Sequence, residues 1–132
     1  LLPKSEGGIV RELVIIFVGS GAGGILRHIV GQAALKILGP SFPYGTLIIN
    51  VLGSALMGLV VGWLLARSST SNEVRLFLAT GLIGGFTTWS TFVLDAVTLW
   101  ERRQPLAAFG YVAGSLLLSF VIISAVLVIV RK

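Results

Sequence analysis

Apolar residues along this chain fall into four long runs that are separated by short polar connections. A membrane-spanning helix needs roughly 20 predominantly apolar residues, and each run is long enough to cross a bilayer once. The pattern therefore predicts an all-α integral membrane protein, with a single domain over residues 1–132 and four transmembrane helices. The helices are expected at about residues 13–38, 44–65, 74–100 and 106–130.

Proline, glycine and polar residues mark the connections between the runs. Residues 39–43 read Gly-Pro-Ser-Phe-Pro, a two-proline turn that ends a helix. Residues 67–72 are rich in serine and threonine, whereas residues 101–105 are charged and end with Pro105, which suits the first turn of the next helix. Because the connections are short, consecutive helices are expected to run antiparallel.

The composition favours the same class of protein. Of the 132 residues, 55% are hydrophobic and only 11% are charged, against about 25% charged in an ordinary soluble domain. Most soluble folds and a disordered chain are therefore excluded. The chain has no cysteine, which excludes disulfides and thiolate chemistry. No nucleic-acid partner is expected, because the net charge is only +5 and the basic residues lie at the ends of the apolar runs.

Basic residues also bear on how the helices insert. The positive-inside rule favours placing the two termini in the cytoplasm. The imbalance is modest, and a chain that inserts both ways round remains open. The terminal side would carry Lys4, Arg11, Arg67, Arg75, Arg131 and Lys132, and the other side Lys36, Arg102 and Arg103.

Glycines inside the predicted spans indicate closely packed helices. Small residues four positions apart, such as Gly58 with Gly62 and Gly110 with Gly114, let helix backbones approach each other in lipid. Four helices do not easily enclose a wide pore. If the chain conducts anything, it is expected to do so as an oligomer.

Polar residues form stripes on two of the predicted spans. Such residues are costly in lipid unless they line water or pair with one another. Four-residue spacing places each set on one helix face, which favours an aqueous path, although polar contacts between helices would also explain it. The stripes consist of Thr46, Asn50 and Ser54 on the second span and Tyr111, Ser115 and Ser119 on the fourth.

The third span contains the densest polar signal, over residues 84–92. A glycine pair is followed by four Ser or Thr residues in five positions, a sequence that makes poor helix. We expect a break in this helix near mid-membrane, where irregular backbone survives only when buried in protein or lining a cavity. Carbonyls freed at such a break can bind a cation and freed amides can bind an anion. A simple packing kink is the alternative.

Three ionisable residues lie within or near the spans. Arg27 would draw anions if it lies in the membrane, or else it extends to the interface. His28 and Asp95 are compatible with interfacial positions, and Asp95 also with an arginine partner. No other carboxylate lies inside a span, which argues against proton-coupled antiport. No catalytic set is visible, so an enzyme is not expected.

These residues together resemble the Fluc (CrcB-type) fluoride channels, over nearly the whole chain. The most specific match is the run Gly-Gly-Phe-Thr-Thr-Trp-Ser-Thr-Phe at 84–92. Supporting matches are Gly-Thr-Leu-Ile-Ile-Asn at 45–50 and Gly-Ile-Leu-Arg at 24–27 on the first two spans, with Tyr111 and Ser115 on the fourth. The family usually has phenylalanine where this chain has Trp89.

The resemblance implies an antiparallel, dual-topology homodimer that lets fluoride leave microbial cells passively. Each dimer of the family has two fluoride pores and a central sodium ion at the broken third helices. By motif position, backbone carbonyls of Gly84 and Thr87 would hold the sodium, and Arg27 would lie toward a vestibule. The fluoride pathway would comprise Asn50, Trp89, Ser90, Phe92, Tyr111, Ser115 and Ser119.

Two other functional classes compete with this interpretation. A small dual-topology exporter of multiple drugs or guanidinium has the same size and helix count, but it predicts an acidic residue deep in the first helix, where the chain offers only Glu12 near the mouth. A non-transporting assembly subunit would explain the glycine faces but not the two polar stripes.

Overall fold

The computed structural model describes residues 6–67 and 69–132, and over these ranges the chain is almost entirely helical, without a strand. Lys4, one of the basic residues counted on the terminal side, lies outside the described residues. In chain order the helices are α1 (Glu6–Leu38), α2 (Tyr44–Ala66), α3 (Asn72–Arg75), the π-helix η1 (Leu76–Ile83), α4 (Gly84–Phe86), α5 (Trp89–Glu101) and α6 (Pro105–Val130).

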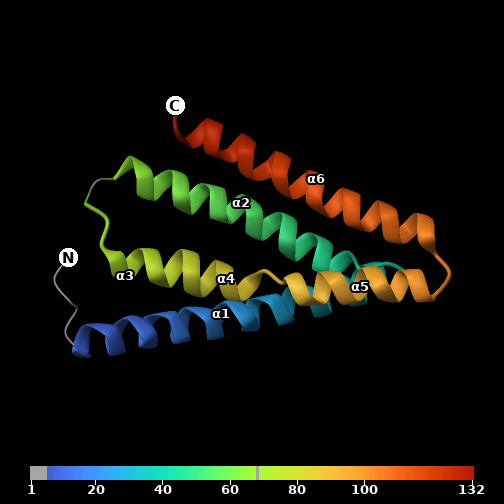
Figure 1. Ribbon diagram of the computed structural model, residues 1–132, viewed down its shortest axis with the longest axis horizontal. Coiled ribbons are helices and arrows are strands. Elements are labelled where there is room, and N and C mark those ends of the chain that lie inside the picture. Colours follow the sequence, from blue (N-terminus) through green and yellow to red (C-terminus); the bar gives the residue numbers. More distant parts are fainter. Residues whose placement is uncertain (1–5, 68) are drawn as a thin grey trace.

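Four spans emerge from these helices, as the hydropathy pattern predicts. Helices α1, α2 and α6 each form one span, and α3, η1, α4 and α5 together form the span from Asn72 to Glu101. The spans lie alongside one another, with the start of α1 and the end of α6 toward the same end of the molecule (Figure 1). Helix α1 begins at Glu6, upstream of the predicted start at Leu13.

The ends of the spans follow the predicted punctuation. Gly39 follows α1 with φ +81°, a left-handed conformation that glycine adopts without steric penalty. The next span begins at Tyr44, directly after Pro43, and α6 begins at Pro105. Ser71 caps α3, since its hydroxyl accepts a hydrogen bond from the Val74 amide at 3.3 Å.

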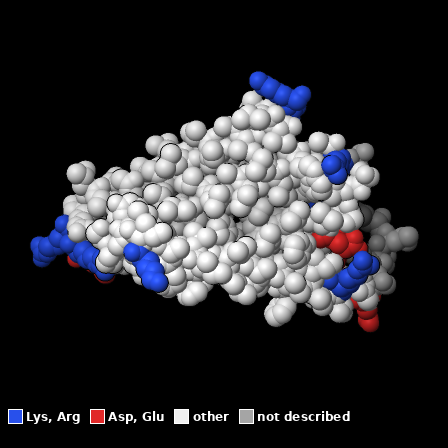
Figure 2. Space-filling model, turned by 180° about the vertical axis from the view of Figure 1, so that it is seen from behind, with Lys and Arg blue, Asp and Glu red and all other residues white. Residues whose placement is uncertain are grey.

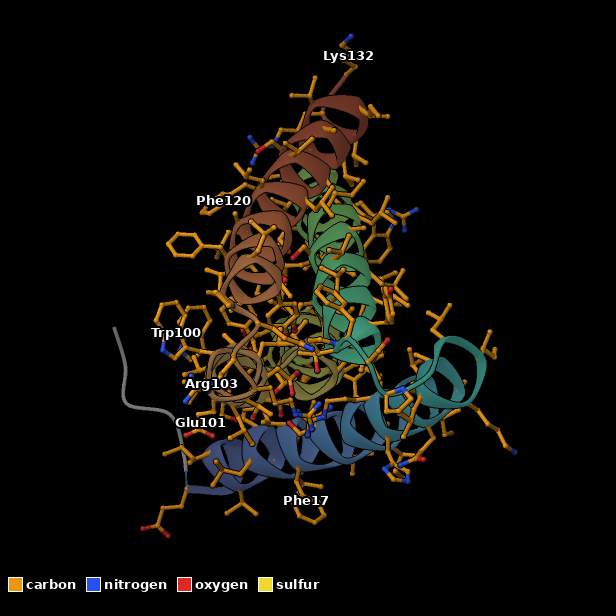
Figure 3. All side chains as sticks on the ribbon, turned by 90° about the vertical axis from the view of Figure 1, so that its right-hand side faces the viewer. Phe17, Trp100, Glu101, Arg103, Phe120 and Lys132 are labelled. Atoms are coloured by element: carbon orange, nitrogen blue, oxygen red, sulfur yellow. The ribbon has the colours of Figure 1, made fainter. Side chains whose placement is uncertain are left out.

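The surface of the bundle suits a lipid environment. Phe17 of α1 and Phe120 of α6 are 79% and 68% exposed and point away from the bundle in different directions (Figure 3). Figure 2 shows a face whose centre is uncharged, with Lys and Arg gathered toward its edges. An apolar flank between charged ends is the pattern that a bilayer selects.

Helix α1 packs on the broken third span through glycines. A Cβ atom on Gly19 would lie 2.8 Å from the Phe77 carbonyl oxygen, and one on Gly23 would overlap the Leu82 carbonyl oxygen. On the α4 side of this contact, a Cβ atom on Gly85 would overlap the Ser20 carbonyl oxygen. Only glycine allows two helix backbones to approach this closely, so this contact fixes α1 against η1 and α4.

The two predicted glycine pairs have different surroundings. Gly58 and Gly62 of α2 face α6, where added Cβ atoms would meet Val126 and Val130. Gly110 and Gly114 of α6 have open space around them within the subunit. The first pair therefore packs helices of one chain, whereas the second presents a small-residue surface to the outside.

The glycine contact yields a stability prediction. Replacing Gly23 with alanine should lower the thermal unfolding midpoint in detergent, because overpacking a close contact costs about 1–3 kcal/mol. The matched control is Gly21→Ala on the same helix, where no atom lies within 4 Å of the added Cβ. That variant should melt at or slightly above the wild-type temperature, since alanine favours helix. Equal midpoints for both variants would contradict the packing argument.

Candidate functional site

The third span breaks at Thr87 and Thr88. Both residues have extended backbone, with φ −77° and ψ 160° at Thr87 and φ −149° and ψ 119° at Thr88. The predicted break is therefore present near the middle of the span. The glycine pair itself stays helical in α4, and the π-helix η1 before it was not anticipated. Such irregular turns in membrane helices recur at functional sites.

Asn50 of α2 holds the break from one side. Its amide nitrogen donates a hydrogen bond to the Thr88 carbonyl oxygen at 2.9 Å, and its amide oxygen accepts one from the Thr88 backbone N–H at 2.8 Å. Two polar groups of a non-helical residue are thereby satisfied by one side chain. One N–H of the Asn50 amide is left for another acceptor.

Arg27 of α1 reaches the break from another helix. Its Nη1 donates a hydrogen bond to the Thr87 carbonyl oxygen at 3.2 Å. Arg27 is one helical turn beyond Gly23, whose close contact with α4 brings this face of α1 against the third span. The guanidinium therefore lies inside the bundle at the break rather than at the membrane surface.

The carbonyls of Gly84 and Thr87 have lost their usual helical donors. In a continuous helix, the Gly84 carbonyl would accept from the Thr88 N–H, but that N–H donates to Asn50. The Thr87 carbonyl would accept from the Thr91 N–H, which donates instead to the Thr88 hydroxyl at 3.4 Å. Carbonyls that have lost their helical donors are suitable ligands for a monovalent cation.

Side-chain ligands offer no comparable metal site. Within residues 6–67 and 69–132, no group of three or more His, Asp or Glu side chains is arranged to hold a metal ion. Gly84 is exposed on the surface of the subunit, so a cation held by its carbonyl would also be accessible to a second chain.

A cavity of about 340 Å³ lies on the α2 and α6 side of the break, and we call it the Ser115 cavity. It joins most of the predicted pathway residues: Asn50, Trp89, Phe92, Ser115 and Ser119 all line it, together with Thr87. Four of the six residues in the two predicted polar stripes thus meet at one space: Asn50, Ser54, Ser115 and Ser119. Its wall combines amide, hydroxyl and aromatic groups without a charged side chain among them.

Ser115 is the most informative residue of this cavity. It is only 4% exposed, and its hydroxyl has no hydrogen-bond partner among the described residues. A buried hydroxyl without a partner is costly, and serines in membrane helices commonly bond their own backbone. A hydroxyl that faces a cavity with its donor unused is suited to a bound anion or to water.

Two predicted pathway residues lie outside the Ser115 cavity. Ser90 is exposed on the outer face of α5. Tyr111 is buried behind Phe92, at 5.2 Å between ring centroids, and its hydroxyl donates to a carboxylate oxygen of Asp95 at 3.2 Å. Aromatic rings form a continuous row from the break to the first connection, through Trp89, Phe92, Tyr111 and Phe42.

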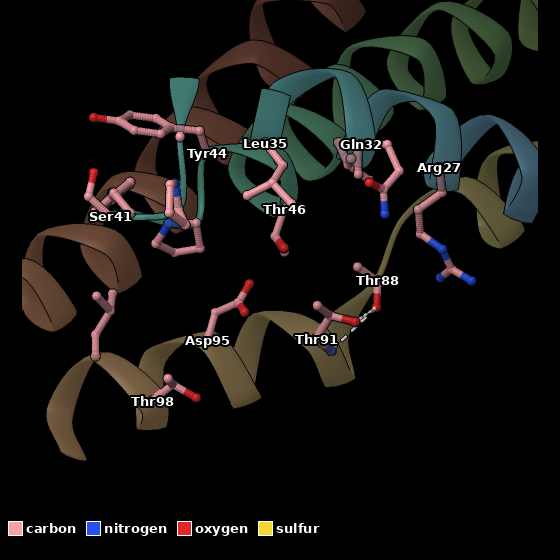
Figure 4. A pocket seen from close by; sticks show the side chains of 18 of the residues that line it. Arg27, Gln32, Leu35, Ser41, Tyr44, Thr46, Thr88, Thr91, Asp95 and Thr98 are labelled. Carbon is pink, nitrogen blue, oxygen red and sulfur yellow. Dashed lines mark hydrogen bonds between the residues drawn. The ribbon is translucent and has the colours of Figure 1, made fainter. Parts of the chain in front are cut away.

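A second cavity, of about 640 Å³, opens between α1, the first connection and α5, and we call it the Arg27 cavity. Figure 4 shows Asp95 projecting into it opposite Thr46, with Arg27 near Thr88 at the far end. His28 and Arg102 also line it. Thr88 lines both cavities, so the break separates them.

Two residues of this site, Thr88 and Asp95, could not be assigned a role from the sequence. Thr88 caps α5 with its hydroxyl and divides the two cavities, and its Ser/Thr-rich context was the only signal for it. Asp95 was left without an assigned partner, although Thr91, Asp95 and Thr98 follow helical spacing and all line the Arg27 cavity. Nothing in the sequence paired it with Tyr111.

Comparison with known proteins gives consistent matches. The family model described as "CrcB-like protein, Camphor Resistance (CrcB)" matches residues 14–127. A protein of Mesorhizobium japonicum named "Fluoride-specific ion channel FluC" is 51% identical over 80% of this chain and 85% of the relative. Proteins of the same name from Methylobacterium nodulans and Caulobacter vibrioides are 49% and 39% identical, over 90% and 93% of this chain and 95% and 98% of theirs.

The Asn50 contacts can be tested by stability. Asn50→Ala leaves the Thr88 N–H and carbonyl without their partner inside the bundle, so unfolding should become easier by about 2–3 kcal/mol. The matched control is Ser54→Ala, one turn further along α2, because the Ser54 hydroxyl bonds only the Asn50 carbonyl of its own helix at 2.8 Å. Thermal midpoints in detergent should fall for the first variant alone. A wild-type midpoint for Asn50→Ala would show that these hydrogen bonds do not hold the break.

Proposed function

This chain belongs to the CrcB family, and from that membership we propose that it is a fluoride-selective channel which exports fluoride passively and so relieves fluoride toxicity. It is a multi-pass protein of a bacterial inner membrane, with fluoride as its permeant ion. The observation that carries the proposal is the Ser115 cavity, where the buried hydroxyl of Ser115 has no partner among the described residues. None of the described residues that line this cavity is charged.

Neutral donors suit the chemistry of fluoride. The ion is small and strongly hydrated, so a dry passage must replace its water with several hydrogen-bond donors. Ser115, Ser119 and the free N–H of Asn50 supply such donors from two helices. Because they carry no charge, they stabilise an anion without holding it so tightly that it cannot leave.

Aromatic edges complete the proposed pathway. Phe92 and Trp89 lie 5.1 Å apart between ring centroids and both line the cavity. The edge of an aromatic ring carries partial positive charge, so both rings can face an anion edge-on. Trp89 adds an indole N–H, a further donor at a position where the family usually has phenylalanine.

A second copy of the chain supplies what one subunit leaves open. Trp89 is 69% exposed although it lines the cavity, and Gly110 and Gly114 present a backbone surface with open space around it. We expect an antiparallel homodimer in lipid, with two pores of opposite direction. Dual topology would follow, in agreement with the modest imbalance of basic residues.

Sodium is the proposed structural ion of this dimer. The carbonyls of Gly84 and Thr87 would hold it, since the hydrogen bonds of Asn50 and Thr88 divert their helical donors. The bound ion would stabilise these carbonyl oxygens, which have lost their helical hydrogen bonds inside the membrane. Sharing of the ion between two chains fits the exposure of Gly84.

Ion efflux from liposomes tests the proposed function. Fluoride efflux should far exceed chloride efflux under the same gradient. Ser115→Ala should slow fluoride efflux about tenfold, the effect of one lost hydrogen bond to a charged group. The matched control is Ser124→Ala on the same helix, an exposed serine outside the Ser115 cavity, which should leave efflux near the wild-type rate. Equal chloride and fluoride efflux would refute selectivity, and uptake of an organic cation coupled to protons would favour the exporter. No ion flux from a folded dimer would favour an assembly subunit.

Removal of sodium tests the proposed ion. Protein purified and reconstituted with N-methyl-D-glucamine in place of sodium should lose fluoride efflux and dissociate more readily in detergent, because four unwound carbonyls would then face one another without a cation. Size-exclusion chromatography and the efflux assay measure the two effects, and potassium serves as the control cation. Unchanged efflux and unchanged dimerisation would contradict a structural sodium ion.

A further inference from the structure

We infer that Arg27 is a positioning residue for the break in the third span, and that its part in transport is more than attracting anions into the cavity that it lines. The hydrogen bond from its Nη1 to the Thr87 carbonyl oxygen, at 3.2 Å, is the observation behind this inference. The part of the inference that concerns sodium rests on the proposed function.

Position along α1 gives Arg27 this reach. Gly19 and Gly23 bring the α1 backbone into direct contact with η1 and α4, and Arg27 follows one turn later on the same face. The next backbone group beyond α4 is the break itself. The backbone of Arg27, on a helix fixed in this way, lies at a defined place relative to Thr87, within reach of the guanidinium.

Thr87 needs such a donor. Its carbonyl has no helical N–H, because the Thr91 amide donates to the Thr88 hydroxyl. Asn50 satisfies both backbone groups of Thr88, and neither of these hydrogen bonds involves Thr87. The two residues of the break are therefore held by two side chains from two helices, Asn50 on Thr88 and Arg27 on Thr87.

A carbonyl oxygen has two acceptor sites. With Arg27 on one of them, the direction of the Thr87 C=O bond is set, and the other site remains for a cation. Loss of the guanidinium would leave this carbonyl free to turn toward other donors. The inference therefore predicts weaker sodium binding after loss of the guanidinium, although a positive charge near the ion is removed. Tighter sodium binding would show that repulsion between the two cations outweighs the orientation of the carbonyl.

Arg102 provides a matched control. It lines the same cavity and carries the same charge, but it follows α5 at the opposite end of the cavity from the break. Arg27→Met removes the charge and the donor together, Arg102→Gln removes a charge only, and Arg27→Lys keeps the charge on a shorter side chain. Hydrogen–deuterium exchange of backbone amides over residues 84–92 reports on the break whether or not the protein transports.

Arg27→Met and Arg27→Lys should both exchange these amides about tenfold faster than wild type, as expected for the loss of one charge-assisted hydrogen bond. Arg27→Met should also raise the sodium concentration for half-maximal fluoride efflux about tenfold, and high ionic strength should not restore it. Arg102→Gln should exchange as wild type, with any loss of efflux confined to low salt.

Two results would overturn the inference. Wild-type exchange in both Arg27 variants would show that the guanidinium does not hold the break. Equal salt-sensitive efflux losses in Arg27→Met and Arg102→Gln, with unchanged sodium dependence, would show that Arg27 acts through charge alone. If the wild-type protein lacks fluoride selectivity, the proposed function fails while the exchange result on the break still decides the role of Arg27.

Discussion

The whole arrangement depends on one constraint, that backbone N–H and carbonyl groups inside a bilayer must find partners within the protein. Two extended residues in the middle of a span would leave backbone groups without hydrogen-bond partners. Helices α1 and α2 each contribute one side chain that supplies such a partner. Asn50 bonds both backbone groups of Thr88, and Arg27 bonds the carbonyl of Thr87. The polar residues of α1 and α2 therefore serve the stability of the third span first, and any ion that passes does so beside a break already held in place.

Glycine makes these polar contacts possible. The polar side chains extend only a few ångströms from their helices, so α1 must approach the third span closely before Arg27 can reach it. Gly19 and Gly23 allow that approach on α1, and Gly53 on α2 leaves room for the Thr87 side chain. Packing in lipid relies on such small residues because apolar side chains gain little by leaving lipid for one another. The glycines therefore bring the helices close enough for the polar side chains to reach the break.

Much of this could be predicted from the sequence. Hydropathy gave four spans, the glycine and threonine run gave the break, and four-residue spacing brought Asn50, Ser115 and Ser119 to one cavity. Contacts between helices could not be predicted, since nothing in the sequence relates Asn50 to Thr88 or Tyr111 to Asp95. Helical spacing also cannot be carried across an extended segment. Because Thr87 and Thr88 are extended, the rotation of α5 about its axis does not continue that of α4. Trp89 and Phe92 therefore face the Ser115 cavity, and Ser90 faces outward.

The position of Thr88 between the two cavities has an electrical consequence. A bilayer core is about 30 Å thick, and the Arg27 cavity extends to the first connection at the end of the bundle. Water in this cavity would carry the potential of the adjoining solution as far as Thr88. The membrane potential, worth about 2.3 kcal/mol per charge at 100 mV, would then fall mainly over the dry side of the break instead of over the whole bundle. An ion that passes the Asn50 amide into the Ser115 cavity would move through most of the field, so voltage would act on this chain chiefly on that side of the break.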